Sequence, residues 1–435
     1  KELNTNFVFL RPLGLRLMET AEKLLSLLLA ALLFCMAGCR TGWDEQGGEG
    51  GNEAQETLHV IGVSVFSQSD PELSMFFRYY QNYIGEGFPV KFLLSDDLGG
   101  AEDEIAFIKA AKAQGAEGII SFYGLDLEQA VKACGENGMY YVLGSASISD
   151  DSFEAVKNNP WFLGVIGPDS DEEFKAGREM AESFAADGAG SFLILSGGAG
   201  EAFNFMHYTR VRGMLTALKE ELGLAYDGEI GALAQITELT SLETGREDVR
   251  ITISPGYLSG EEGAGNLERA LAKDDFDAIL SATGINSAID LLAEELKTSE
   301  TPVQAGVVDC FSRENCEAVE ITGPLGNPLL RYVKGKYAPM AAPAFVAMFN
   351  ALEGDADVVK PDGAAFRIYQ TYWTAASAEE YVELYNYTQN IFENVYSAVE
   401  LMDAIRIYNP QADFEAFRAL VDNSALESVQ ARIGG

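Results

Sequence analysis

The chain has 435 residues, and 47% of them are hydrophobic, so it is long and apolar enough to bury a core in two or three domains. Its formal net charge is −37, from 67 acidic and 30 basic residues. This charge would repel a phosphate backbone, which excludes nucleic acid as an expected partner. The sequence has only two histidines, His59 and His207, no Cys-x-x-Cys pair and no Gly-x-x-x-x-Gly-Lys-Ser/Thr loop. We therefore expect neither a metal centre nor another cofactor.

The first 38 residues have the pattern of a secretion signal. The apolar run Leu24–Met36 has thirteen residues, which as a helix cover about 20 Å, less than the roughly 30 Å of a bilayer core. Such a short run, ending in small residues, favours a signal peptide over a membrane span. Met36-Ala37-Gly38-Cys39 resembles the lipobox of bacterial lipoproteins, which implies a lipid on Cys39 and attachment to the extracytoplasmic face of a cell membrane. A plain signal peptide with an incidental cysteine is the alternative.

Residues 39–57 are polar and rich in glycine, a composition that predicts a flexible tether. Beyond them, short apolar runs without polar alternation are separated by amphipathic helical patterns. This arrangement predicts parallel sheets covered by helices on both faces. The predicted strands are His59–Phe66, Val90–Leu94, Gly118–Tyr123, Tyr140–Gly144, Trp161–Gly167, Ser191–Gly200, Val249–Tyr257, Ala278–Gly284 and Val303–Cys310.

Two successive units of this kind predict an α/β protein with two Rossmann-like, doubly wound lobes. A ligand would lie between the carboxyl ends of their strands. The sequence of residues 378–435 is rich in Tyr, Glu and Ala and predicts mostly helices. We expect them to form a helical C-terminal extension packed against a lobe.

Residues 58–373 resemble the type I periplasmic-binding-protein family, the ribose- and galactose-type solute receptors of ABC importers. The resemblance rests on the order and spacing of segments such as "IGVSVFSQSDPELSMFF", "RVRGMLTALKEELG", "AILSATGINSAIDLL" and "VVDCFSRENCEAV". It implies a three-segment hinge, with crossings near 164–168, 328–334 and 365–369. The N-terminal lobe would then comprise 58–166 plus about 335–365, and the C-terminal lobe 167–334 plus about 366–377.

The resemblance also implies a set of ligand-binding residues. Arg210 matches an arginine that forks onto ligand oxygens, and Asp309 matches an aspartate that accepts hydrogen bonds from hydroxyls. A place on a helix surface for Arg210 and a helix N-cap role for Asp309 are the structural alternatives. The other matched positions are Asp70 in the first loop, Tyr257 or Leu258 at an aromatic stacking position, and Thr283 where asparagine is common.

Two positions depart from the sugar receptors. Gly144-Ser145 replaces an Asp-Arg pair, which brings Ser145 into the predicted site, and Glu72-Leu73 replaces paired aromatic residues. These departures argue against an ordinary pentose or hexose and leave other small polar ligands open.

The sequence therefore predicts a monomeric, lipid-anchored solute-binding protein that delivers a small polar, sugar-like ligand to ABC permease subunits and is not an enzyme. A sensory receptor of the same fold is an open alternative. A surface hydrolase would need His59 or His207 as its base. A transcription regulator is disfavoured, since no helix-turn-helix precedes the first strand. A disulfide between Cys310 and Cys316 is left open, with two separate thiols favoured.

Overall fold

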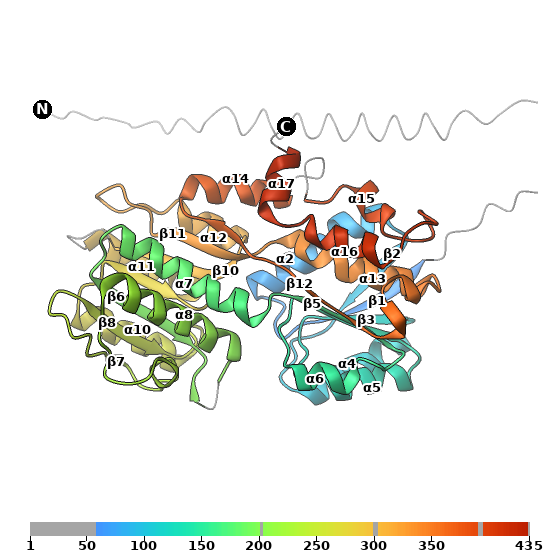
Figure 1. Ribbon diagram of the computed structural model, residues 1–435, viewed down its shortest axis with the longest axis horizontal. Helices are drawn as coiled ribbons and strands as arrows, with labels where there is room; N and C mark the ends of the chain where they lie inside the picture. Colours follow the sequence, from blue (N-terminus) through green and yellow to red (C-terminus); the bar gives the residue numbers. More distant parts are fainter. Residues whose placement is uncertain (1–57, 201–202, 299–302, 390–394, 434–435) are drawn as a thin grey trace, which may run out of the picture. The chain divides into compact units, whose positions relative to one another are not determined.

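The computed structural model describes residues 58–200, 203–298, 303–389 and 395–433. The predicted signal peptide, Cys39 and the tether lie outside these residues. The described chain builds two separate β-sheets, each with helices on both faces (Figure 1). Within these ranges, no helix is both long enough and apolar enough to cross a bilayer.

The first sheet has the strand order β2-β1-β3-β4-β5-β12, and every strand is parallel to its neighbours. Its inner strands are fully or largely buried, as the unbroken apolar runs predicted, whereas the edge strands β2 and β12 are partly exposed. The strands are β1 (His59–Ser64), β2 (Val90–Leu94), β3 (Gly118–Ser121), β4 (Tyr140–Gly144), β5 (Phe162–Gly167) and β12 (Phe366–Tyr369).

The second sheet repeats this order as β8-β6-β9-β10-β11, and it adds an antiparallel strand at each edge, β7 beside β8 and β13 beside β11. In a sheet of this order the connections leave in opposite directions on either side of the first strand, so a ligand crevice opens at that point. The two switch points lie between β1 and β3 and between β6 and β9. The strands are β6 (Ser191–Gly197), β7 (Thr240–Ser241), β8 (Arg250–Pro255), β9 (Ala278–Ser281), β10 (Gln304–Cys310), β11 (Leu330–Lys336) and β13 (Trp373–Ala375).

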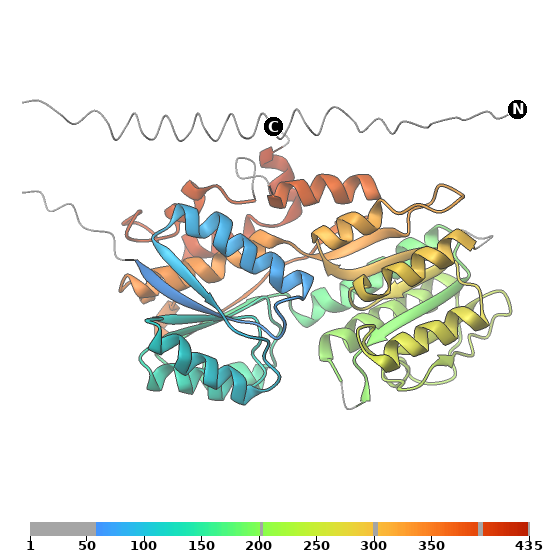
Figure 2. The same cartoon turned by 180° about the vertical axis from the view of Figure 1, so that it is seen from behind.

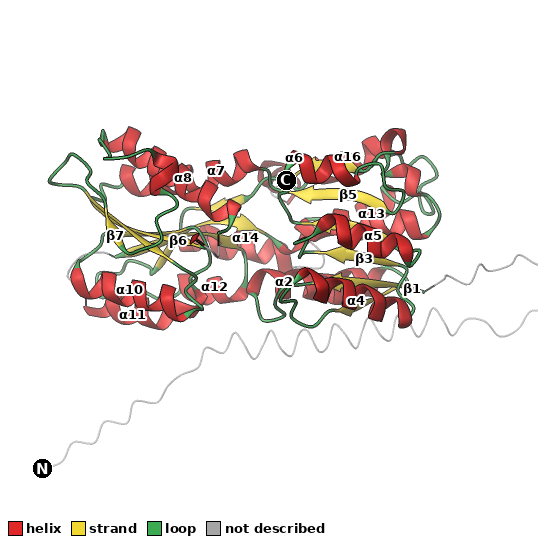
Figure 3. Cartoon of the chain, turned by 90° about the horizontal axis from the view of Figure 1, so that it is seen from below, coloured by secondary structure: helices red, strands yellow, loops and turns green. Residues whose placement is uncertain are grey.

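Helices fill the connections and cover the sheets. For the second sheet, α7 and α8 lie on one face and α10 and α11 on the other (Figure 3). The α-helices up to the C-terminal region are α2 (Pro71–Tyr79), α3 (Gly85–Gly87), α4 (Ala101–Ala113), α5 (Leu127–Glu136), α6 (Asp150–Val156), α7 (Ser170–Ala186), α8 (Phe205–Leu222), α9 (Ile230–Leu233), α10 (Glu261–Lys273), α11 (Ile289–Thr298), α12 (Arg313–Val319) and α13 (Ala342–Leu352). A π-helical segment, Tyr80–Ile84, continues α2.

The chain passes between the two sheets after β5, after β11 and between β12 and β13. The last two passages come later than the expected 328–334 and 365–369. β11 stays in the second sheet as far as Lys336, and β12 pairs with β5 in the first sheet, whereas 366–377 was expected in the C-terminal lobe. Lys334 and Lys336 interrupt the apolar pattern of β11, so the sequence did not predict this strand. Both lysines are buried in the structure, where carboxylates pair with them.

The C-terminal helices are α14 (Ala378–Gln389), α15 (Ala398–Asp403), α16 (Phe414–Asp422) and α17 (Leu426–Ile433), which confirms the predicted helical extension. They lie along one side of both halves of the described unit (Figure 2). α14 contacts α12, β11 and β13, while α16 contacts α13 of the first lobe. Tyr337 and Trp373, which follow the second and third passages, both donate hydrogen bonds to Ser424. The extension is therefore built into the hinge region and packs on both lobes.

Candidate functional site

The carboxyl edge of the second sheet gathers four of the predicted site residues. Thr283 follows β9, Tyr257 follows β8, and Asp309 lies near the end of β10. A Cβ atom on Gly197, at the end of β6, would stand 2.7 Å from Nδ1 of His207 and 2.8 Å from Cγ2 of Thr283, so these two side chains flank the switch point between β6 and β9. Gly197 has a φ of 70°, which together with this close approach explains why glycine is needed there.

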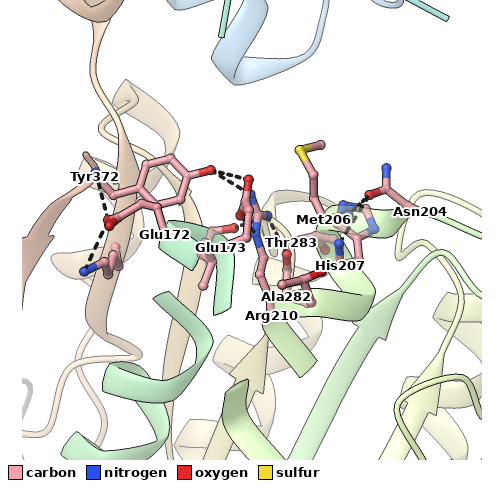
Figure 4. Close-up of polar contacts among 12 residues, drawn as sticks. Glu172, Glu173, Asn204, Met206, His207, Arg210, Ala282, Thr283 and Tyr372 are labelled. Carbon is pink, nitrogen blue, oxygen red and sulfur yellow. Dashed lines mark hydrogen bonds and ion pairs between the residues drawn. The ribbon is translucent and has the colours of Figure 1, made fainter. Parts of the chain in front are cut away.

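Arg210, the fourth residue, is fixed by protein groups. It is 6% exposed, and its Nε donates to Glu173 of α7 at 2.6 Å. Nη1 donates to the carbonyl oxygens of Ala282 at 2.8 Å and Val308 at 3.3 Å, and Nη2 donates to the hydroxyl of Tyr372 at 3.1 Å (Figure 4). The guanidinium thus ties α7, the ends of β9 and β10, and the third passage together. A direct ligand contact by Arg210 stays a prediction.

Close helix packing brings this ion pair together. At Gly177 and Gly213 a Cβ atom would collide with the backbone of the other helix, of Arg210 and Phe174 respectively. α7 and α8 therefore cross at backbone contact, which places Glu173 beside Arg210. Burial alone would lower the pKa of Arg210, but the Glu173 carboxylate and the Tyr372 hydroxyl outweigh it and raise the pKa above its usual value.

Asp309 is the predicted hydroxyl acceptor. Its Oδ2 accepts a hydrogen bond from Nδ2 of Asn315 at 2.6 Å. Burial, assisted by the nearby Glu72 carboxylate, raises the pKa of Asp309 to about 6, although Asn315 and Arg210 act in the opposite direction. This carboxyl group makes no ion pair with any residue in the described ranges, and the Cys310 side chain is a further hydrogen-bond partner that acts to lower its pKa.

The first lobe contributes Asp70 and Ser145. Asp70 is the N-cap of α2, where its Oδ1 accepts a hydrogen bond from the Leu73 amide at 3.1 Å. Burial raises the pKa of Asp70 to about 7, with further contributions from the Glu72 and Asp309 carboxylates. Ser145, directly after β4, has a left-handed φ of 55°, a conformation that costs a non-glycine residue roughly 1–2 kcal/mol. Such strain is typical of functional loops.

Lys336, which the sequence analysis did not select, joins the two lobes. It ends β11 and is 4% exposed. Its Nζ donates to Oε1 of Glu72 in α2 at 2.7 Å and to the carbonyl oxygen of Ser145 at 3.2 Å. α2 also contacts β10, the strand that carries Asp309. The carboxyl edges of the two sheets therefore meet around Asp70, Asp309 and Lys336.

His207 is a second residue that the sequence left undecided. The ring is 8% exposed, and its Nδ1 accepts a hydrogen bond from the Gly198 amide at 3.2 Å. Burial, followed by the charges of Arg210 and Lys336, lowers the pKa of His207 to about 3. The neutral ring therefore carries its proton on Nε2. A base with so low a pKa is poorly matched to neutral pH, which weakens the hydrolase alternative.

Tyr257 lies beside this histidine, with ring centroids 5.5 Å apart and the rings edge to face. It is 38% exposed, so one part of the ring is free to stack on a ligand.

The three cysteines in the described ranges, Cys134, Cys310 and Cys316, are free thiols. Within those ranges no group of three or more His, Cys, Asp or Glu residues is arranged to hold a metal ion.

Solved structures share this fold. A galactofuranose binding protein is 13% identical, with a TM-score of 0.54 over 76% of this chain and 99% of its own length. The periplasmic binding protein component of the arabinose ABC transporter from Shewanella sp. ANA-3, bound to α- and β-L-arabinofuranose, is 14% identical, with a TM-score of 0.51 over 75% of this chain and 94% of its own. A LacI family transcriptional regulator from Silicibacter pomeroyi is 14% identical, with a TM-score of 0.47 over 73% and 98%.

No protein-family model and no curated protein sequence matches the chain. At these low identities the structural likeness establishes the fold. The chain has the two-lobed α/β fold of the type I periplasmic sugar-binding proteins.

Proposed function

We propose that the chain is a solute-binding protein that holds a small polyhydroxylated ligand between the carboxyl edges of its two sheets. The observation that carries this proposal is the contact between α2, which Asp70 caps, and β10, which carries Asp309, at the edges where doubly wound sheets bind ligands. Both carboxyl groups retain unused acceptor capacity. The binding of furanose sugars by two proteins of this fold supports the same ligand class.

The candidate residues make different kinds of contact with the ligand. Asp70 and Asp309 accept hydrogen bonds from ligand hydroxyls, and Nε2–H of His207 donates one to a ligand oxygen. The exposed part of Tyr257 packs against the C–H face of a sugar-like ring. Arg210, with its donors directed at Glu173, Tyr372 and two carbonyl groups, positions the strand ends.

Because these groups come from both lobes, a ligand that contacts them all favours the conformation in which the lobes approach. We further propose that this conformation is delivered to an ABC importer at the extracytoplasmic face of the membrane, with the chain anchored through a lipid on Cys39. The Shewanella neighbour, a component of an arabinose ABC transporter, supports this role. A sensory receptor would use the same conformational signal with a different membrane partner.

Thermal unfolding with a ligand panel tests the binding function. The panel comprises pentoses, hexoses, polyols, amino sugars and nucleosides, each measured with X-ray scattering as a second readout. A ligand at a hundredfold its dissociation constant stabilises the folded state by about 2.7 kcal/mol, which raises the unfolding midpoint. A raised midpoint together with a smaller radius of gyration is the expected result. If no member of the panel changes either quantity, the proposed function is wrong.

A further inference from the structure

The three passages between the lobes are tied to one another by hydrogen bonds. The backbone amide of Gln370, in the third passage, donates at 2.9 Å to the carbonyl oxygen of Gly167, which ends β5 at the first passage. Nε2 of Gln370 donates at 3.0 Å to the carbonyl oxygen of Met340 in the second passage. Gln370 is buried, so both bonds are shielded from water. The passages therefore form one connected hinge.

The C-terminal extension adds a connection between the lobes outside these passages. α16 contacts α13 of the first lobe, and the buried ring of Phe417 in α16 lies edge to face with Phe366 of β12, with centroids 5.1 Å apart. Ser424 follows α16, and its carbonyl oxygen accepts a hydrogen bond from Nε1 of Trp373 at 3.0 Å. Trp373 is the first residue of β13 in the second sheet. This short segment thus joins the first lobe directly to the second.

The second passage is held by the same serine. The hydroxyl of Tyr337, directly after β11, donates to Oγ of Ser424 at 2.8 Å, and the Tyr337 ring stacks on that of Trp373 with centroids 4.1 Å apart. Both rings are fully buried. Tyr337 and Trp373 lie where the passages enter the second lobe, whereas Ser424 is attached to the first lobe through α16. A rotation of one lobe against the other therefore moves both donors relative to Ser424.

We propose that residues 414–424 are a strap that limits how far the two lobes separate when no ligand is bound. Separation would withdraw Tyr337 and Trp373 from Ser424 and leave a buried carbonyl group without its donors. Two hydrogen bonds of ordinary strength favour the narrow form over the wide form by about thirtyfold. The strap concerns the movement of the lobes, so it goes beyond the proposed function and does not depend on which ligand is bound.

Removing the two donors tests the strap. Tyr337→Phe removes one donor and Trp373→Phe removes the other, and the double variant keeps an aromatic ring at both positions. X-ray scattering of the ligand-free protein measures the radius of gyration, and hydrogen–deuterium exchange with mass spectrometry measures the opening of residues 337–341 and 370–372. We expect the double variant to have a larger radius of gyration than the unmodified protein and faster exchange in both passages.

Tyr226→Phe is the matched control. The Tyr226 hydroxyl donates to the carbonyl oxygen of Leu215 at 3.1 Å, so this variant removes a bond of the same kind within the second lobe alone. We expect it to leave the radius of gyration and the exchange of the passages unchanged. Ser424→Ala removes only the hydroxyl and is the mildest variant, with a smaller shift in the same direction as the double variant. Circular dichroism shows which variants are folded.

The outcomes decide the strap without any ligand. If the folded variants at Tyr337, Trp373 and Ser424 keep the radius of gyration of the unmodified protein, the strap is wrong, even where they are less stable. Should the double variant not fold, Tyr337→Phe and Ser424→Ala decide the question by the same two measurements. An equal increase in Tyr226→Phe overturns the assignment to Ser424. The solute-binding function is tested separately by the ligand panel, and either proposal can fail while the other stands.

Discussion

Replacing Arg210 by methionine separates a positioning role from a ligand contact. The side chain is 6% exposed, and its guanidinium donates to Glu173, Tyr372 and two backbone carbonyl groups. Methionine keeps much of the apolar volume but removes every one of these donors. Glu173, 1% exposed, then keeps the Tyr372 hydroxyl as its one side-chain donor among the described residues.

The expected loss is large because a buried charge is left without its partner. Removing one member of a buried ion pair costs about 3–5 kcal/mol, a large part of the roughly 5–15 kcal/mol that stabilises a typical folded domain. Adding Glu173→Gln to Arg210→Met removes the unpaired charge and recovers part of this loss. Arg178→Met is the control, because Arg178 lies in α7 with partly exposed partners, Glu182 and Glu220, and it loses at most about 1 kcal/mol.

Urea unfolding followed by circular dichroism measures the free energy of unfolding of the unmodified protein and of these variants, together with the single variant Glu173→Gln. The double-mutant cycle formed by the unmodified protein, the two single variants at Arg210 and Glu173, and the double variant gives the coupling between these residues. The reasoning is refuted if Arg210→Met loses no more stability than Arg178→Met. Unchanged stability combined with a selective loss of ligand affinity would instead show that Arg210 contacts the ligand directly.

Three further predictions concern the lobe junction and the C-terminal extension. Lys336→Met removes the basic partner of Glu72 and lowers the free energy of unfolding, measured by urea unfolding, by about 2 kcal/mol. The pKa of Asp70 is raised from its usual 3.8 to about 7 in the folded state. Between pH 3.8 and about pH 7 the folded state therefore binds more protons than the unfolded state, so the stability of the unmodified protein falls as the pH rises through this range. Asp70→Asn reduces that fall, and an unchanged pH profile would contradict the burial argument. Phe417→Ala removes a fully buried ring whose centroid lies 5.1 Å from that of Phe366, and it lowers the free energy of unfolding by about 3–5 kcal/mol. The midpoint of the main thermal transition is therefore lowered. An unchanged midpoint would mean that the C-terminal helices unfold independently of the lobes.

The sheets could be predicted because their sequence signal is local. Buried parallel strands are unbroken apolar runs, and β4 and β5 follow this rule closely. β11 departs from it, since Lys334 and Lys336 interrupt the apolar pattern and are tolerated only because carboxylates from α7 and α2 reach them. The sequence cannot show that pairing, because the partners lie more than 150 positions away.

The candidate site was likewise only partly predictable from the sequence. Asp70, Thr283 and Asp309 could be placed at strand ends by their position after apolar runs, and the structure has them at the carboxyl edges. The ion pair of Arg210 with Glu173 depends on the crossing of α7 and α8 at two glycines, which is a property of tertiary packing. The neutral state of His207 likewise follows from burial, which no local pattern reports.

The central claim is that one ligand is held by both lobes at the junction of Asp70 and Asp309. A crystal structure of the protein with the tightest-binding ligand of the panel tests it most directly. We expect a ligand within hydrogen-bond distance of both carboxyl groups and of Nε2 of His207. A ligand that contacts only one lobe, or that lies away from Asp70 and Asp309, would contradict it.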